Sequence, residues 1–445
     1  MKSLMILALL LLLTACTDRS DDDIFIWDES VENPFYGETL TVAVMYRDPM
    51  WRFINLFEQD NPGVEIELIV LGTDFEAVRE RLGVQLMAGE SPMLMESFFV
   101  NMRNLGMFVD WMPLMEAHPS FNDDEWFMDA FHTLAVDGRL FAFPTTFVYR
   151  SNSGNINVPG LVDLLRQMDS ITKQEIIEIY HAFGGLDSGL HMASTDIGKS
   201  VWFSEEFVDF ETGFVNFTSP AFLGLLEMAS EIMKPVPDSV LDEFTRTGGW
   251  DDLSANYYMF DIGHFCHVRG SDILYGDMDF SGRLPLVSED GELFIIPSMY
   301  QRWVLSAAAT KTQRALALDF IRFTQDVTDI RIRSIFDGRE YLIGGEVQIN
   351  RARFDHCLRR DMDSSLRGVT RHRDLRMSID DTLDYLIDQV KRELDRPMVA
   401  EPIVPEGIVA FLNGILDDLN LGIVSPHEAA TALQNRVMLE ILEGN

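Results

Sequence analysis

Cysteine, basic residues and long apolar runs are all scarce in this sequence of 445 residues. Its three Cys are too few for a framework of several disulfides. Lys and Arg number 35 against 72 Asp and Glu, a formal net charge of -37. That balance argues against the phosphate backbone of nucleic acid as a partner. Beyond the first residues, no apolar run approaches the roughly 20 residues of a membrane-spanning helix.

The length and the apolar content indicate two folded domains. A chain of 445 residues is too long for one small core, and 47% hydrophobic residues are enough to fill two. The excess of acidic side chains mainly keeps such a protein soluble.

The first residues are typical of an export signal. One Lys at position 2 precedes an apolar run from Leu4 to Leu13 that is too short to span a bilayer. The following LTAC, which ends at Cys16, resembles the bacterial lipoprotein box and implies that residues 1–16 are a signal peptide with an acylated Cys. We therefore expect an exported protein, lipid-anchored at the outer face of the bacterial cytoplasmic membrane. An ordinary secretory signal with an incidental Cys is the alternative.

Export leaves Cys266 and Cys357 as the internal cysteines. An oxidising compartment permits a bond between them, but their separation in the sequence gives no distance in space. We expect reduced, buried thiols at both positions.

Residues 17–37 are acidic and lack periodicity, which is typical of a flexible tether. After them, β-branched runs predict strands, and apolar residues about one turn apart predict helices bounded by Pro, Asp or Gly. The predicted order is β-α-β-α: a strand at 40–45, a helix at 49–59, a strand at 64–70 and a helix from Thr73 or Asp74 to Gly89.

The stretch from Asp137 to Arg150, DGRLFAFPTTFVYR, predicts the first crossing of the chain between two lobes. An Asp-Gly turn leads into an aromatic and apolar run that stops at Pro144 and resumes before the polar SNSGN. We interpret this stretch as turn, strand, break and strand, with Tyr149 beside the crossing.

Four segments follow one another in the first third of the chain: FEQDNPGVEIEL, MAGESP, LGMFVDWMPLME and DGRLFAFPTT. They resemble the amino-terminal lobe of family 1 extracellular solute-binding proteins, the sugar-type receptors of ABC importers. SMYQRWVLSAAATKTQRALALDFIRFT resembles the segment that returns to this lobe, whereas Met93 stands where the family often has Asp. The resemblance implies an α/β, two-lobe, periplasmic-binding-protein-like type II fold with a ligand cleft between the lobes. The implied lobes are 38–148 plus about 295–340, and 149–294 plus about 341–445.

The later parts of the chain are predicted to be mostly helical, and no sheet can be traced for the second lobe. Apolar spacing indicates helices near 161–165, 176–180, 222–233 and 379–394, and one in which Ala315, Leu318 and Ile321 face one side. Ser425-Pro-His-Glu428 predicts a capping box. The arginine-rich stretch 351–376 fits a solvated helix face better than a partner surface.

Catalytic and metal signatures are missing or incomplete. The sequence contains neither HExxH nor GxSxG, and the Gly-Lys-Ser at 198–200 lacks the opening glycine of a phosphate loop, because position 193 is Ala. The acidic segment 277–289 begins like a calcium loop, but its closing acid comes one residue late. His264 and His267 have no second cluster to complete a metal site. We expect no cofactor and no metal.

Candidate ligand contacts follow from a rule for open α/β sheets, which bind ligands at the carboxyl ends of their strands. Aromatic rings suit the apolar faces of sugars, and charged groups bond their hydroxyls. Trp250 is the best single candidate, because two glycines before it indicate a loop. For the second lobe, YYMFDIGHF resembles the family's segment around a Gly-aromatic pair. The full set is Tyr46, Arg47, Asp48, Ser97, Phe98, Tyr149, Trp250, Tyr257, Tyr258, His264, Phe265 and Tyr300.

The function predicted from the resemblance is that of a receptor and not of an enzyme. It would capture a carbohydrate or oligosaccharide between its lobes and deliver it to ABC permease subunits, with closure driven by contacts better made in the closed state. Two alternatives stay open. A surface glycoside hydrolase needs two carboxylates at a set separation, which a sequence does not show. A ligand-sensing subunit for a membrane kinase would share the same fold.

Overall fold

A computed structural model divides the chain into two compact units. Unit 1 comprises Met1–Thr146, Ser298–Ile343 and Ile349–Arg353, and unit 2 comprises Phe147–Pro297, Gly344–Gln348 and Phe354–Asn445. The residues that the structure describes are 25, 27, 33–45, 47, 50–72, 74–97, 105–136, 138–155, 158–184, 202–203, 206–209, 213–232, 260–264, 280–288, 290–297, 302–326, 331–333, 340–342, 347–370, 379–400, 404 and 406–444.

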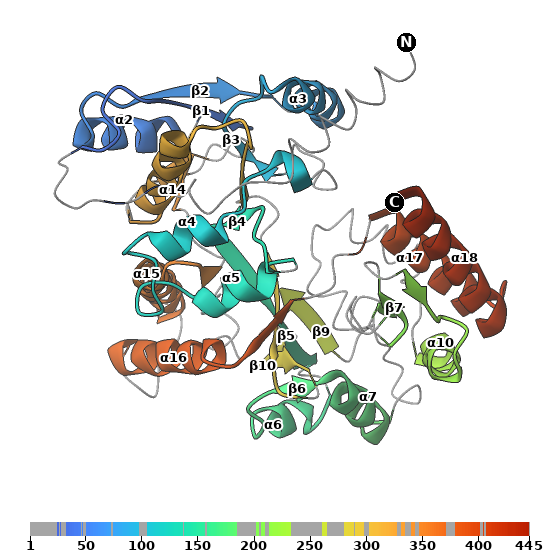
Figure 1. Cartoon of the computed structure of the whole chain (residues 1–445). Coiled ribbons are helices and arrows are strands. Elements are labelled where there is room, and N and C mark those ends of the chain that lie inside the picture. The colour runs from blue at the N-terminus through green and yellow to red at the C-terminus, as the bar shows by residue number, and fades with distance from the viewer. Residues whose placement is uncertain are drawn as a thin grey trace, which may run out of the picture. The chain divides into compact units, whose positions relative to one another are not determined.

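Unit 1 is built on a five-stranded sheet with the order β2-β1-β3-β12-β4 (Figure 1). β1 (Thr39–Val44) pairs in parallel with β2 (Glu65–Val70) and β3 (Leu94–Glu96), so these three strands end at the same edge. β12 (Arg302–Leu305) runs antiparallel to β3 and to β4 (Phe143–Pro144), and therefore begins at that edge. We call it the carboxyl edge.

The predicted β-α-β-α order of unit 1 is confirmed. Between the strands lie α2 (Met50–Asp60) and α3 (Phe75–Ala88). The side chain of Asp74 accepts a hydrogen bond from the Ala77 N–H at 3.3 Å and caps α3, which ends at Gly89 with a left-handed φ of 72°. Local signals of this kind define a helix without help from distant residues.

α14 (Lys311–Asp326) packs against α2 and β1, and Figure 1 shows α2 and α14 along the same side of β1 and β2. Its predicted apolar face is confirmed, because Ala315, Leu318 and Ile321 are all buried. The smaller elements of unit 1 are η3 (Leu105–Met107), α4 (Met112–Ala117), α5 (Met128–Leu134), β13 (Arg331–Arg333) and β14 (Glu340–Leu342).

Packed side chains of unit 1 begin before residue 38. Phe35 is buried, and the ring of Phe25 stacks on it at 5.6 Å between centroids. Trp27 lies edge-on to His118 at 4.6 Å. Three residues of the expected tether 17–37 are thus packed: Phe25 against Phe35, and Trp27 against His118 of unit 1.

Unit 2 contains the sheet that the sequence did not reveal. Its main path has the order β15-β5-β10-β11-β16, with β6 paired to β10 and β9 paired to β5. The strands are β5 (Thr146–Asn155), β6 (Ile171–Thr172), β9 (Phe260–His264), β10 (Phe280–Val287), β11 (Leu293–Pro297), β15 (Val347–Gln348) and β16 (Met398–Ala400).

β5 is longer than the sequence predicts. The polar SNSGN continues the strand to Asn155, because Ser151 pairs with Gly263 of β9 and Asn152 with Ile262. These partners lie more than a hundred residues further along the chain. Such pairing supplies the backbone hydrogen bonds that the local sequence alone would not predict.

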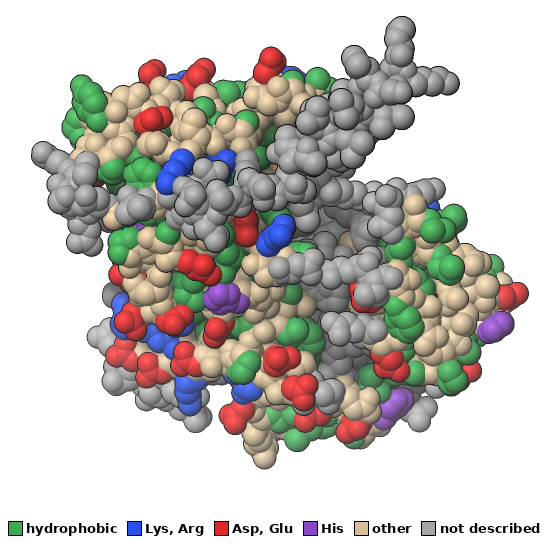
Figure 2. Space-filling model, viewed as in Figure 1, with side chains coloured by type: hydrophobic (Ala, Val, Ile, Leu, Met, Phe, Trp, Pro, Cys, Tyr) green, Lys and Arg blue, Asp and Glu red, His purple; other side chains and the backbone are tan. Residues whose placement is uncertain are grey.

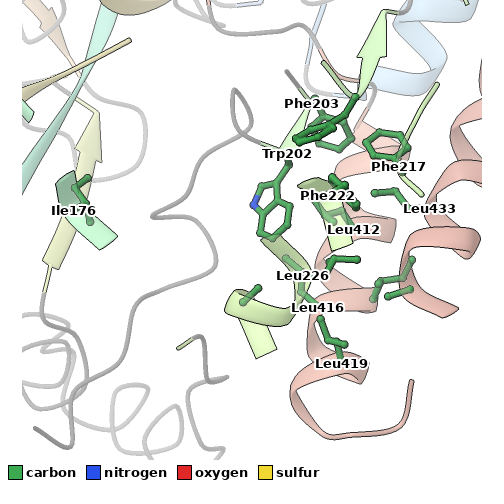
Figure 3. Close-up of a cluster of buried hydrophobic side chains, with 14 of the residues drawn as sticks. Ile176, Trp202, Phe203, Phe217, Phe222, Leu226, Leu412, Leu416, Leu419 and Leu433 are labelled. Carbon is green, nitrogen blue, oxygen red and sulfur yellow. The ribbon is translucent and has the colours of Figure 1, made fainter. Parts of the chain in front are cut away.

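The helices predicted near 161–165, 176–180, 222–233 and 379–394 are confirmed, and apolar side chains of the first three pack with aromatic residues into one core. Figure 3 shows Trp202, Phe217 and Phe222 beside Leu412 and leucines of the neighbouring helices. The predicted capping box is also present, with Ser425 Oγ accepting from the Glu428 N–H at 3.3 Å. The elements are α6 (Leu161–Leu165), α7 (Lys173–Ala182), β7 (Val208–Asp209), β8 (Phe214–Val215), α10 (Pro220–Ile232), α15 (Arg351–Thr370), α16 (Ile379–Leu394), α17 (Glu406–Asn420) and α18 (Pro426–Gly444).

Basic and acidic side chains are interspersed over α15 and α16 (Figure 2). Arg359, which is 57% exposed in its side chain, pairs with Asp384 at 3.0 Å. The prediction of a solvated helix face is confirmed for this residue, but it is wrong for Arg353, which is buried and bonds the Thr324 carbonyl. Cys357 on the same helix is buried, as predicted.

Candidate functional site

The carboxyl edge of unit 1 carries the described polar residues that best fit a ligand site. Arg47 follows β1, Glu96 ends β3, Ser97 follows it, and Arg302 begins β12. Glu96 pairs in register with Trp303, so Ser97 and Arg302 are the next residues outward on the two strands. Ligands of open α/β sheets bind at such an edge.

Glu96 supplies a carboxyl group that can change protonation near neutral pH. Its Oε2 accepts a hydrogen bond from the Met45 N–H at 2.7 Å. Burial raises the pKa of Glu96 to about 7, although the bond from Met45 acts in the opposite direction. Near neutral pH the group therefore both accepts and donates hydrogen bonds, which is suited to sugar hydroxyls.

Ser97 and Arg302 each bury a polar atom that has no partner. Ser97 is 5% exposed, and neither its Oγ nor the Nε of Arg302 makes a hydrogen bond in the part of the chain that the structure describes. Burial also lowers the pKa of Arg302. Buried polar groups in folded proteins nearly always have partners, and these two atoms lie at the edge of the sheet where a ligand would bind.

Arg47 lines a pocket of about 420 Å³ on the flank of unit 1 between α2 and β2. Trp51 at the start of α2 is 39% exposed and contributes an aromatic surface to this pocket. The other lining residues are Ile54, Asn55, Glu58, Ile66, Leu68 and Val70.

Tyr149 belongs to unit 2 and is 1% exposed. Its hydroxyl donates a hydrogen bond to Glu393 Oε2 at 2.5 Å, and its backbone pairs with Ile295 of β11. Its ring is therefore enclosed by protein in this structure, and its contact with a ligand stays a prediction. The backbone of His264 pairs with Arg150, also in unit 2.

The other predicted site residues lie outside the described part of the chain, and so do Cys16, Cys266, Asp277 and Asp279. They remain predictions: Tyr46, Asp48, Phe98, Trp250, Tyr257, Tyr258, Phe265 and Tyr300.

Two properties follow from a search of the described residues alone. They contain no group of three or more His, Cys, Asp or Glu side chains that would hold a metal ion. No helix among them combines the length and the apolar character needed to cross a membrane.

Glu96 and Arg302 are not among the site residues predicted from the sequence. Each stands next to a predicted contact or crossing residue: Glu96 precedes Ser97, and Arg302 lies two residues after Tyr300. A charged residue at the end of a predicted strand was the available signal. Its burial and its lack of a partner depend on the whole sheet and are not visible in the sequence.

The architecture defines the fold class as that of two-domain periplasmic binding proteins, and solved structures agree. The sugar-binding protein MalE from Xanthomonas citri is 16% identical with a TM-score of 0.59, covering 91% of this chain and 98% of that chain. The periplasmic oligogalacturonide binding protein from Yersinia enterocolitica is 11% identical with a TM-score of 0.59, covering 91% and 99%. An extracellular solute-binding protein family 1 structure from Alicyclobacillus acidocaldarius is 13% identical with a TM-score of 0.54, covering 91% and 98%.

No protein-family model and no curated protein matches the sequence. At these low identities the structural matches show the fold, and the predicted resemblance to the solute-binding proteins is confirmed at that level.

Proposed function

We propose that this protein is an extracellular solute receptor that binds a carbohydrate or oligosaccharide and delivers it to an ABC importer. The main observation in support is the carboxyl edge of unit 1, where Glu96, Ser97 and Arg302 hold buried polar atoms. Their place at the ends of β3 and β12 is where an α/β sheet offers a ligand site. Solved proteins of the same fold include the sugar-binding MalE and the oligogalacturonide binding protein.

The finer parts of the proposal come from the sequence. Residues 1–16 would provide export and an acylated Cys16, and the two lobes with the boundaries given above would close on the ligand. We propose binding without catalysis, with a signal passed on by closure. Replacing Cys16 with Ser should release the protein from the membrane fraction, and an unchanged distribution would refute the lipid anchor.

The receptor function is tested with the full chain purified in detergent. Calorimetry and thermal shift with a panel of neutral and acidic oligosaccharides should show saturable binding by at least one of them. Chromatography of the same mixtures should show the glycans intact. Shortened glycans would favour the surface glycoside hydrolase, and a panel without any binding would contradict the proposed function.

A further inference from the structure

At the carboxyl edge, two buried polar atoms lack hydrogen bonds to the described residues, and this lowers the stability of the fold. Ser97 Oγ and Arg302 Nε are both buried without a partner among the described residues. A buried polar group without a hydrogen bond costs about 1–3 kcal/mol, and more when it is charged. Two such groups at neighbouring positions, without a partner in the part of the chain that the structure describes, favour a partner supplied by a ligand.

The register keeps Arg302 away from the nearest acid on the adjacent strand. Glu96 pairs with Trp303, and directly opposed residues share one face of a sheet. Arg302 precedes Trp303 in β12, so its side chain lies on the other face. Accordingly, burial alone lowers the pKa of Arg302, and the Glu96 carboxylate does not neutralise its charge.

We propose that Ser97 and Arg302 form a subsite for an anionic oxygen group on the ligand. This inference rests on the proposed receptor function and narrows its ligand class to acidic sugars. The planar guanidinium offers Nε–H and a terminal N–H as two parallel donors to a carboxylate, sulfate or phosphate. The hydroxyl of Ser97 donates a third bond to the same group.

Local contacts must provide this affinity, because the chain as a whole repels anions. Its formal net charge is -37. Repulsion from distant surface charges is screened over about 10 Å at 0.1 M salt, whereas a buried pair is screened much less. Binding of an acidic sugar at this subsite should therefore persist at high ionic strength.

The test is calorimetry of the full chain in detergent with four probes. They are an oligogalacturonate, its neutral methyl ester, a sulfated oligosaccharide and inorganic phosphate. We expect at least one anionic glycan to bind at least about tenfold more tightly than the neutral ester. Arg302→Gln should remove most of that preference, and the probe that loses affinity identifies whether carboxylate, sulfate or phosphate is recognised.

Three further variants separate ligand recognition from structure. Arg81→Gln makes the same change of charge at an exposed position on α3, and it should leave affinity unchanged. Arg302→Lys keeps the positive charge but loses the two parallel N–H donors of the guanidinium. Its affinity for the anionic probe should therefore lie between those of the wild type and Arg302→Gln. Ser97→Ala should lower the affinity for the anionic probe several-fold. This variant still tests the subsite if Arg302→Gln does not fold.

The melting temperature of the protein without ligand separates a binding role of Arg302 from a structural one. A structural role predicts a lower melting temperature in Arg302→Gln. Removing a guanidinium whose buried Nε has no partner among the described residues should leave the melting temperature of Arg302→Gln equal to or above that of the wild type. A lower melting temperature with unchanged affinity would make Arg302 a structural residue and overturn the inference.

The possible results distinguish the two proposals. Equal binding of the ester and the acid, or affinities that Arg302→Gln leaves unchanged, overturns the subsite and keeps the receptor. Binding of phosphate alone, lost in Arg302→Gln, supports the subsite and contradicts the sugar receptor. Absence of binding by every probe overturns both.

Discussion

The two edges of the unit 1 sheet differ in whether their buried serine hydroxyls are hydrogen-bonded to the described residues. At the edge opposite to the carboxyl edge, Ser306 follows β12 and is 3% exposed. Its Oγ accepts hydrogen bonds from Ser91 Oγ at 3.1 Å and from the Ala308 N–H at 3.3 Å, and its N–H donates to the Met93 carbonyl. At the carboxyl edge, Ser97 is similarly buried, but its Oγ has no partner within the described ranges. The contrast indicates that one edge serves the fold and the other keeps bonding capacity for a ligand.

The largest change in stability at the carboxyl edge is expected from Glu96→Gln, because burial there raises the pKa of Glu96. The value is about 7 in the folded chain against 4.5 for an ordinary Glu. Between these values the folded state keeps a proton that the unfolded chain has lost. The free energy of unfolding therefore falls as the pH rises through this window and is constant above it. The neutral Gln avoids this loss.

We expect the stability gain of Glu96→Gln to grow by about 2 kcal/mol between about pH 5.5 and pH 8. Urea denaturation at both pH values measures it, and both lie above the sequence pI of 4.4. Glu90→Gln, at an exposed position just after α3, is the matched control and should show no such change. A gain that is the same at both pH values would mean that Glu96 titrates normally.

Ser306→Ala should come next in size. The variant leaves the hydroxyl of Ser91 and the N–H of Ala308 without their acceptor. We expect a loss of about 1.5 kcal/mol in the free energy of unfolding, measured in urea at a fixed pH. A neutral result would show that the bonds of this edge are replaced by water, and it would remove the contrast between the two edges.

Tyr149→Phe extends the comparison to a satisfied hydroxyl in unit 2. Loss of the bond to Glu393 should cost about 1 kcal/mol of stability. Tyr36→Phe is the control, because Tyr36 is 78% exposed and the change should cost almost nothing. Calorimetry of Tyr149→Phe with a glycan that binds the wild type tests the predicted contact between Tyr149 and the ligand. Unchanged affinity together with lost stability would make Tyr149 purely structural.

The contrast also explains which features could be predicted from the sequence. The helix α3 was predictable because Asp74 and Gly89 mark its ends locally. The sheet of unit 2 was not, because strands such as β5 are partly polar and find partners far along the chain, as Ser151 does at Gly263. Periodicity records the burial of a local face and not the identity of a distant strand.

The same limit applies to the site. Ser97 was predictable because the carboxyl ends of strands bind ligands, a rule that needs only the strand assignment. Arg302 was not, since its significance arises from the burial of its Nε, which has no partner in the part of the chain that the structure describes. Whether a hydrogen bond is made depends on residues far apart in the sequence, and their arrangement in space is not encoded locally.

Ser97→Ala should cost the least stability and is the sharpest test of the comparison. Its hydroxyl is buried without a partner among the described residues, so its removal should leave the free energy of unfolding unchanged or raise it. Ser306→Ala is the matched control, because both serines are buried and each directly follows a strand of the same sheet. Urea denaturation of the two variants side by side should therefore give unequal losses. Equal losses would mean that Ser97 has a structural partner, and the carboxyl edge would then differ from the opposite edge only in its charges.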